Sequence, residues 1–491
     1  MPIFSLPSPW GIGTLGAQAR AFADFLAQGG QSCWQILPIG PTGYGDSPYQ
    51  SFSTFAGNPY FIDLDDLVRR GLLQPEEYQS LFWGDDPERV DYQALYQNRF
   101  SVLRLACRRL EEREGEALAS FCREEAGWLE DYALFMALKE ENGGRPWMEW
   151  PQGERLRRPQ ALEQAKVRLR EETAFWKGVQ YLFFTQWRAL KKYVNSLGIA
   201  LLGDVPIYVA GDSADVWANP EQFQLDEDGL PTQVAGCPPD GFCADGQLWG
   251  NPLFHWERMK EEGYRWWLDR LSFQFTLYDT LRIDHFRGFE SYYAIPYGEA
   301  TARNGVWRPG PGLDFFRRVN QMLGRRDIVA EDLGFLTPQV HKLLRDTGYP
   351  GMKVLQFAFS SREKGSEYLP HCYPARCVVY PGTHDNDTIL GWLAHAPRKE
   401  ASFAREYLRL SRREGYHWGV IRGAWASPAQ LAVVQLQDLL GLGSTARINT
   451  PSTLGGNWQW RALPGCCTPS LARRLRREMK VYQRLPGQGG R

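Results

Sequence analysis

The sequence predicts an α/β fold of the (β/α)8 TIM-barrel class, elaborated by helical and loop insertions. Three short apolar runs each end at an acidic residue and a loop, and these acidic residues are Asp284, Glu331 and Asp385. Such a run is typical of a barrel strand that delivers a side chain to the carboxyl end of the barrel, where active sites of this fold lie. The chain has 491 residues, and barrels with insertions can exceed ~400 residues as one unit. We therefore expect a single elaborated domain over residues 1–491.

Helix and strand signals alternate in the way that a barrel requires. Residues 17–27 form an apolar helical stretch between Gly- and Pro-rich segments, and residues 33–37 follow as a short strand. A second pair consists of a helix over 178–197, which stops at Gly198, and a buried strand over 199–205. This rhythm predicts parallel strands joined by helices.

Two long segments interrupt the alternation. Residues 61–176 are charged and helical, which predicts a mainly helical insertion subdomain. Residues 209–256 show little regular periodicity, and structureless loops beyond ~12–15 residues are usually functional, so we expect an active-site lid there. The residues after Asp387 read as helices and loops with no C-terminal β-sandwich, and residues 486–491 as a flexible tail.

The amino-acid composition limits the kinds of molecule that the protein is expected to bind and the compartment in which it is expected to lie. The chain carries 56 Lys and Arg against 57 Asp and Glu, a net charge of −1, so nothing in its charge favours nucleic acid or an anionic membrane. The sequence has neither an apolar run of membrane length nor a basic-then-apolar start, and we expect a cytoplasmic protein. The nine cysteines lack CxxC spacing and read as reduced packing thiols. Nineteen tryptophans favour a sugar ligand, because flat apolar rings suit sugar faces.

The three acidic residues suit glycosidic chemistry. Side chains alternate along a strand, so Arg282 and Asp284 point into the same barrel mouth, where a guanidinium favours a carboxylate nucleophile. Glu331, facing two ionised aspartates across a low-dielectric cleft, is pushed toward its protonated form and suits the general acid and base. Asp385, beside His384, would bind sugar hydroxyls and stabilise a distorted ring. Two displacements retain configuration and require carboxyl groups ~5–5.5 Å apart.

Taken together, these residues resemble the 4-α-glucanotransferases, also called amylomaltases or disproportionating enzymes, a branch of the α-amylase clan. Four segments stand in the order and spacing of the clan's signature regions, and they end at Asp204, Asp284, Glu331 and Asp385. Motifs particular to the branch are Asp46-Ser47-Pro48-Tyr49-Gln50, residues 246–252, Arg447-Ile448-Asn449-Thr450-Pro451 and Asn457-Trp458. The resemblance covers nearly the whole chain.

The resemblance implies a retaining transferase that moves α-1,4-glucan segments from a maltooligosaccharide or starch chain to the 4-hydroxyl of an acceptor glucan or glucose. The intermediate would be a glycosyl ester of Asp284, with no cofactor and no metal, and the partners would be maltooligosaccharides and starch- or glycogen-type glucans. The implied substrate-binding residues are Tyr49, Asp240, Gln247, Trp249, Arg282, His285, His384 and Asn449. Asp204 is expected to order a loop by hydrogen bonding rather than to catalyse.

The chain departs from related chains in two places. Ile448 and Ser452 replace Met and Gly in an Arg-Met-Asn-x-Pro-Gly-Thr motif. Related chains also carry a strand-forming apolar segment before the Leu-Pro stretch at residues 6–7, and here the sequence starts at Met1. We expect the first barrel strand to be missing and the natural chain to be longer, because an open barrel edge is costly; a truncated but functional protein is the other reading.

Two other functions stay open at this point. A retaining α-glucan hydrolase would carry the same carboxylates with a leakier loop, and a non-catalytic glucan-binding protein would need none of them. Before the resemblance is considered, Tyr49 and Trp249 fit loop packing as well as sugar stacking. The sequence leaves the ratio of transfer to hydrolysis, the preferred glucan length, cyclisation and the oligomeric state undetermined.

Overall fold

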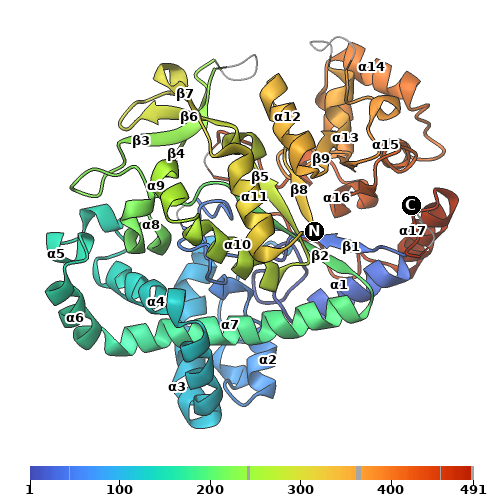
Figure 1. Cartoon of the computed structure of the whole chain (residues 1–491). Coiled ribbons are helices and arrows are strands. Elements are labelled where there is room, and N and C mark those ends of the chain that lie inside the picture. The colour runs from blue at the N-terminus through green and yellow to red at the C-terminus, as the bar shows by residue number, and fades with distance from the viewer. Residues whose placement is uncertain (44, 240–243, 335, 361–365, 454, 488–491) are drawn as a thin grey trace.

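The computed structural model describes residues 1–43, 45–239, 244–334, 336–360, 366–453 and 455–487 (Figure 1). Within these ranges, seven short parallel strands form two sheets. The first sheet has the order β1-β2-β5-β8, with β1 at Cys33–Gln35, β2 at Ala200–Pro206, β5 at Thr280–Asp284 and β8 at Ile328–Ala330. The second has the order β11-β10-β9, with β9 at Gly351–Val354, β10 at Cys377–Tyr380 and β11 at Leu431–Ala432.

The two sheets meet between β8 and β9, where the Ala330 N–H donates to the Pro350 carbonyl at 2.9 Å. The strands are apolar on both faces, as parallel strands covered on both sides are; Leu201, Leu202 and Val205 of β2 are each 1% exposed. The sequence predicts a barrel of eight strands from which the first strand is missing. In the structure the two sheets do not close into a ring: β1 and β11 are sheet edges, and the described residues contain no strand between them.

Helices precede most of these strands along the chain (Figure 1). Their bounds are α1 Ala17–Gln28, α2 Leu64–Arg69, α3 Tyr92–Glu124, α4 Ala126–Glu141, α5 Gln152–Arg155, α6 Pro159–Arg168, α7 Arg170–Ser196, α8 Ala214–Ala218, α9 Trp256–Glu261, α10 Arg265–Leu277, α11 Gly312–Leu323, α12 Pro338–Thr347, α13 Ile389–His395, α14 Arg398–Tyr407, α15 Tyr416–Trp425, α16 Leu436–Leu440 and α17 Pro469–Val481. Helix α7 begins eight residues earlier than the sequence predicts, at Arg170 rather than 178, and continues the helical block that starts with α2. None of the described helices combines the length and the apolarity needed to cross a membrane.

Residues 209–256 are more regular than the sequence predicts. They contain α8, β3 (Gln233–Cys237) and β4 (Gln247–Pro252). Strand β3 pairs antiparallel with both β4 and β6 (Ser291–Pro296), and β7 (Val306–Pro309) completes a sheet of order β4-β3-β6-β7 (Figure 1). Gly and Pro in β3 and β4 weaken the local strand signal, and pairing with β6 overrides it. This part of the chain is therefore a small sheet rather than a structureless loop.

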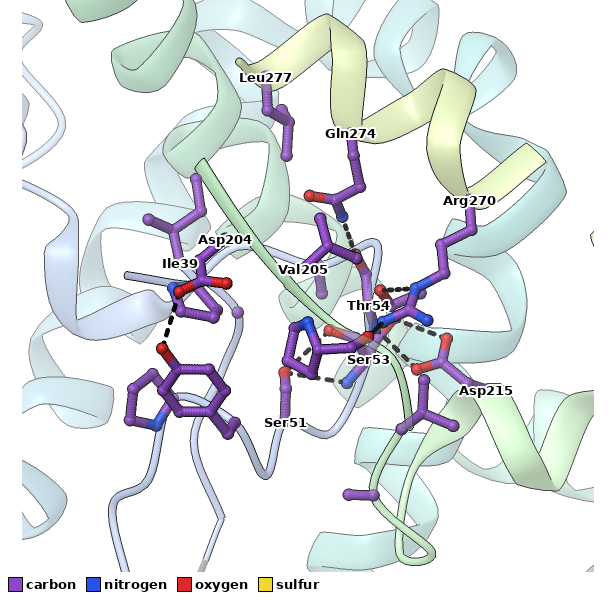
Figure 2. A pocket seen from close by; sticks show the side chains of 18 of the residues that line it. Ile39, Ser51, Ser53, Thr54, Asp204, Val205, Asp215, Arg270, Gln274 and Leu277 are labelled. Carbon is purple, nitrogen blue, oxygen red and sulfur yellow. Dashed lines mark hydrogen bonds between the residues drawn. The ribbon is translucent and has the colours of Figure 1, made fainter. Parts of the chain in front are cut away.

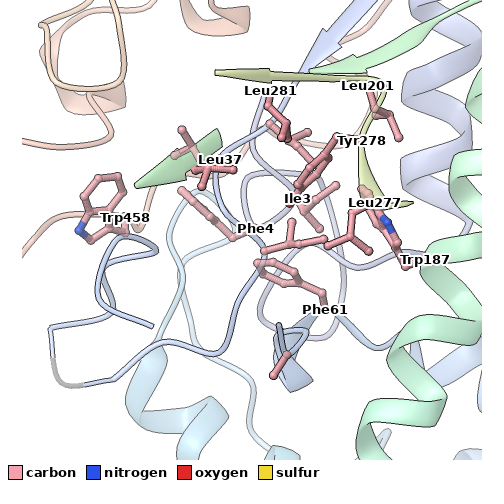
Figure 3. Packing of buried hydrophobic residues seen from close by; sticks show 14 of the residues in the cluster. Ile3, Phe4, Leu37, Phe61, Trp187, Leu201, Leu277, Tyr278, Leu281 and Trp458 are labelled. Atoms are coloured by element: carbon pink, nitrogen blue, oxygen red, sulfur yellow. The ribbon is translucent and has the colours of Figure 1, made fainter. Parts of the chain in front are cut away.

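One large apolar core joins the segments that carry the site. Figure 3 shows Ile3 and Phe4 in the same cluster as Leu37 and Leu281, so the first residues of the chain pack against the segment that follows β1 and against β5. In the same core, Gly203 of β2 lies so close to the Tyr278 ring that a Cβ atom there would be 2.3 Å away. Close packing of this kind fixes β2, and with it the residue that follows, Asp204.

Candidate active site

The acidic residues singled out from the sequence lie at the carboxyl ends of neighbouring strands. Asp284 is the last residue of β5, and Glu331 directly follows β8. The Glu331 N–H donates to the Ile283 carbonyl at 3.0 Å, so the β5–β8 pairing extends to this residue. Asp385 lies in the loop after β10. Parallel strands thus bring together three carboxylates that are distant in the sequence.

Arg282 holds two carboxylates at once. Its Nη1 atom donates to both carboxylate oxygens of Asp204, at 2.8 and 2.7 Å, and its Nη2 atom lies 2.8 Å from Oδ1 of Asp284. Burial alone would lower the pKa of Arg282, but Asp204 and Asp284 raise it well above its usual value. The Asp204 side chain is fully buried, whereas that of Asp284 is 30% exposed. The guanidinium therefore orients the Asp284 carboxylate, and part of that carboxylate stays accessible to a ligand.

Glu331 is buried in surroundings that favour the protonated form of its carboxyl group. Burial, followed by the charge of Asp284, raises the pKa of Glu331 to about 8. Arg282 and two backbone donors act in the opposite direction: the His285 N–H lies 2.7 Å from Oε2 and the Leu333 N–H 2.7 Å from Oε1. His285 has a left-handed backbone, with φ 51°, which turns its N–H toward the carboxyl group. Burial outweighs these contacts, so the pKa of Glu331 stays above its usual range and the protonated form of this carboxyl group is favoured.

Asp385 is held by the segment around Asn449. The Asn449 side-chain amide donates to Oδ1 of Asp385 at 2.6 Å, and Nε2 of His384 lies 3.4 Å from the same oxygen. Arg447 donates to the Asp385 backbone carbonyl at 2.6 Å. The Asp385 side chain is 45% exposed. Asn449 and His384 therefore hold Oδ1 of Asp385, while the carboxylate stays accessible to a ligand.

Aromatic rings form one wall of the site. Tyr49 stacks on His384 with ring centroids 5.1 Å apart, and Trp458 lies 5.8 Å from His384 and 5.9 Å from Tyr49. The Tyr49 hydroxyl donates to Oδ2 of Asp204 at 2.8 Å. Tyr49 therefore has a structural partner as well as a ring face near the carboxylates.

Behind Asp204 lies a cavity of about 40 Å³ that opens toward a second buried carboxylate (Figure 2). Asp215, on its far side, accepts a hydrogen bond from the Thr54 N–H at 2.7 Å. Burial raises the pKa of Asp215 to about 7, and Arg270 opposes that shift. Arg270 also donates to the Pro206 carbonyl at 2.6 Å. This polar cluster fastens the end of β2, on which Asp204 stands.

The opposite wall comes from the small sheet. Trp249 of β4 places its ring edge-on to His285, with centroids 4.8 Å apart, and its indole N–H donates to the Gln247 side chain at 3.1 Å. Burial lowers the pKa of His285 to about 4, so the imidazole is neutral. Its Nε2 atom is buried without a partner in the described part of the chain. Asp240, the remaining residue predicted to bind substrate, lies outside the described residues.

A family profile described as 4-alpha-glucanotransferase matches residues 1–465. The chain belongs to the 4-alpha-glucanotransferase family. It is 47% identical to the 4-alpha-glucanotransferase of Clostridium butyricum, over 99% of this chain and 100% of that protein. It is 49% identical to that of Thermus thermophilus, over 98% and 97% of the two chains. The sequence resemblance is thereby confirmed.

Solved structures agree with this assignment to the 4-alpha-glucanotransferases. An amylomaltase from Streptococcus agalactiae in complex with acarbose superposes with a TM-score of 0.96 at 41% identity, over 99% of this chain and 98% of the other. An amylomaltase from Corynebacterium glutamicum, at 21% identity, has a TM-score of 0.75 over 99% of this chain and 74% of that one, which shows a shared fold.

Three contributions to this glucanotransferase site were not predicted from the sequence. Asp204 was expected to order a loop by hydrogen bonding, and it does accept a hydrogen bond from Tyr49 in the loop around residues 46–50, but its contact with Arg282 was not predicted. Trp458 and Arg447 were noted only as parts of family motifs, and they pack against His384 and hold the Asp385 backbone. Arg282 bridges Asp204 and Asp284 because β2 pairs with β5. The sequence of a single segment does not encode that pairing.

Proposed function

We propose that the chain is a retaining 4-α-glucanotransferase in which Asp284 is the nucleophile and Glu331 the general acid and base. The observation that carries the proposal is a buried Glu331, whose pKa is raised to about 8, beside a partly exposed Asp284 that Arg282 orients. Two carboxyl groups in opposite protonation states are what a double displacement at an anomeric carbon needs. Family membership supports the reaction class.

In the first displacement, a carboxylate oxygen of Asp284 attacks the anomeric carbon of the donor glucan. The bond from that carbon to the glycosidic oxygen breaks, and Glu331 gives its proton to the leaving 4-oxygen. The products are a β-linked glycosyl ester of Asp284 and a shortened glucan. Glu331 is left as a carboxylate, stabilised by the N–H groups of His285 and Leu333.

In the second displacement, the 4-hydroxyl of an acceptor glucan attacks the same carbon. Glu331 accepts the hydroxyl proton, the ester bond to Asp284 breaks, and an α-1,4 bond forms. The two inversions give net retention. We expect the two carboxyl groups to lie ~5–5.5 Å apart, the separation that retaining enzymes use.

Asp385 acts on the donor sugar ring. Its accessible oxygen would accept hydrogen bonds from the 2- and 3-hydroxyls, contacts that strengthen as the ring flattens toward an oxocarbenium-like state. Support comes from Asn449 and His384, which hold its other oxygen. The proposed substrate-binding residues are Tyr49, Asp240, Gln247, Trp249, Arg282, His285, His384 and Asn449.

The segment 209–256 would decide whether water or a glucan takes the glycosyl unit, because excluding water favours transfer. Trp249 of this segment stands beside His285, and its indole N–H donates to the Gln247 side chain. Maltooligosaccharides and starch- or glycogen-type glucans are the proposed substrates, in line with the acarbose bound by the similar Streptococcus agalactiae amylomaltase. The alternative is a retaining hydrolase with the same carboxylates.

A product ladder from maltotriose tests the proposal. Transfer converts two maltotrioses into glucose and maltopentaose and then longer chains, whereas hydrolysis yields glucose and maltose alone. An Asp284→Asn protein with an unchanged far-ultraviolet spectrum is the matched control and should leave maltotriose intact. Glucose and maltose without longer products would establish the hydrolase instead.

A further inference from the structure

A second cavity of ligand size lies near the end of the chain, apart from the active site. It has a volume of about 660 Å³, which falls within the range of small-molecule sites. Its walls come from the loop 411–414, from α15 and from α17 (Figure 1). None of the active-site residues described above lines it. Whatever binds there therefore binds outside the glucan site.

The lining of this cavity is rich in arginine. Five of its residues are arginines, against two glutamates, whereas the chain as a whole has a net charge of −1. The loop supplies Arg413 and Glu414, and α15 supplies Arg422. On α17 the lining positions are three and four residues apart, so they share one face of that helix: Ser470, Arg473, Arg474, Arg477 and Glu478. A concave surface lined mainly by one sign of charge concentrates ligands of the opposite sign.

The two glutamates do not neutralise these arginines. Arg422 donates from Nε to Oε1 of Glu414 at 2.8 Å and from Nη2 to Oε2 at 3.2 Å, which pairs both groups. Arg477 contacts Glu478 at 2.9 Å, but its side chain is 71% exposed, and exposed pairs of this kind contribute little. Within the described chain, three cavity arginines form no ion pair with a carboxylate: Arg413, Arg473 and Arg474.

Arg474 is held in place although it has no carboxylate partner. Its guanidinium lies over the Trp418 ring, 3.7 Å from the ring centroid, and its Nη2 atom donates to the Glu414 backbone carbonyl at 3.2 Å. Trp418 is buried in the core. Burial, followed by the charge of Arg474, lowers the pKa of the neighbouring His417, as a nearby positive charge does. A guanidinium fixed in this way loses little side-chain entropy when it binds an anion.

The cavity fits an anion that carries more than one negative charge. A phosphate monoester has a charge of about −1.5 to −2 at neutral pH and three acceptor oxygens, and the planar fork of arginine matches such oxygens in pairs. Ser470 stands in the first turn of α17, where backbone N–H groups add partial positive charge. A water molecule occupies only about 30 Å³, so the cavity has room for the alcohol part of an ester as well as for its phosphate.

We propose that this cavity binds a phosphate dianion, free or as the phosphomonoester of a sugar, through Arg413, Arg473 and Arg474. Arg477 joins them when the phosphate replaces Glu478 as its partner. The sugar ester is the form that fills the remaining volume, since its hydroxyl groups can bond to the serine and glutamate side chains of the lining.

The test is isothermal titration calorimetry of the full chain, in a buffer without phosphate, with inorganic phosphate and with glucose 6-phosphate. One saturable site is expected for each chain. Tighter binding of the ester would identify the sugar phosphate as the ligand, and equal affinities would identify free phosphate. Glucose 6-sulfate, a monoanion of similar shape, is the ligand control and should bind at least ~10-fold more weakly. Equal binding of the sulfate, or no saturable binding of either phosphate, would overturn the proposal.

A matched pair of protein variants places the binding in this cavity. Arg473→Gln combined with Arg477→Gln removes two guanidinium groups from the lining and should weaken phosphate binding at least ~10-fold. Arg412→Gln combined with Arg476→Gln changes the net charge equally at positions that do not line the cavity, and should leave the affinity nearly unchanged. All four side chains are exposed, so both variants should keep the far-ultraviolet spectrum of the parent chain. Equal weakening in the two variants would mean that net charge alone attracts phosphate, and would overturn the proposal.

Discussion

The proton on Glu331 makes a quantitative prediction about stability. Burial and Asp284 raise the pKa of this carboxyl to about 8 in the folded chain, from its ordinary value of 4.5. That difference, at ~1.36 kcal/mol for each pH unit, corresponds to about 5 kcal/mol in the free energy of unfolding. Glu331→Gln removes the titration and therefore isolates its contribution.

Whether the free energy of unfolding rises or falls with pH depends on which state, folded or unfolded, binds the proton of Glu331 more tightly. At low pH Glu331 is protonated in both the folded and the unfolded chain, and its stabilising contribution is fully present. Between pH 4.5 and about 8 the unfolded chain releases the proton and the folded chain keeps it, so the free energy of unfolding falls as the pH rises. Above about 8 the contribution is lost. The free energy of unfolding of the parent chain minus that of Glu331→Gln should therefore fall by about 5 kcal/mol across this window.

Urea unfolding followed by tryptophan fluorescence, at several pH values from 4.5 to 8.5, measures this difference. Glutamine cannot accept from both the His285 and the Leu333 N–H groups, so the variant carries a constant loss of about 1–3 kcal/mol. That offset does not depend on pH and leaves the slope intact. Two stability curves that run parallel across the window would refute the reasoning. In the same range, kcat/KM of the parent chain should decline above pH about 8, because the acid must enter the reaction protonated.

Three further predictions concern neighbouring residues. Asp284→Ala should lower transfer from maltotriose by at least ~10³-fold with an unchanged far-ultraviolet spectrum; activity near that of the parent would remove the nucleophile assignment. Asp204→Asn should shift the alkaline limb of kcat/KM to lower pH by about one unit, because the pKa of Glu331 falls; an unmoved limb would contradict this. Gly203→Ala, whose Cβ would lie 2.3 Å from the Tyr278 ring, should lower the free energy of unfolding by about 1–3 kcal/mol in urea titrations, and Tyr278→Leu should recover part of the loss.

The strand ends were predictable because their signal is local. An apolar run that stops at an acid places Asp284 and Glu331 on β5 and after β8, where the structure has them. The small antiparallel sheet was not predictable in this way, since β3 and β4 contain Gly and Pro and depend on pairing with β6. Local composition reports the propensity of a segment, whereas its partner strand decides its conformation.

Helix α4 shows the same limit within the segment 61–176, which the sequence predicts to be mainly helical. Its residues Trp128, Tyr132, Phe135 and Met136 predict one apolar stripe. In the structure, nearly every residue from Leu129 to Lys139 is buried, because α4 packs between α7 and α8. A stripe read from spacing identifies one packed face, but the number of neighbours that cover a helix is set by the tertiary fold.

The long-range contacts of Asp204 explain why the two carboxyl groups of the site differ. Arg282 lies next to Asp284, and with no other partner its full positive charge would favour an ionised Glu331 as well. Asp204 accepts two hydrogen bonds from the guanidinium and offsets that charge within the fold. Burial and the charge of Asp284 then have the largest influence on Glu331, and both raise its pKa. The register of the β2–β5 pair sets Asp204 opposite Arg282, so a residue that touches no reacting atom in the proposed mechanism reduces the positive charge beside the acid.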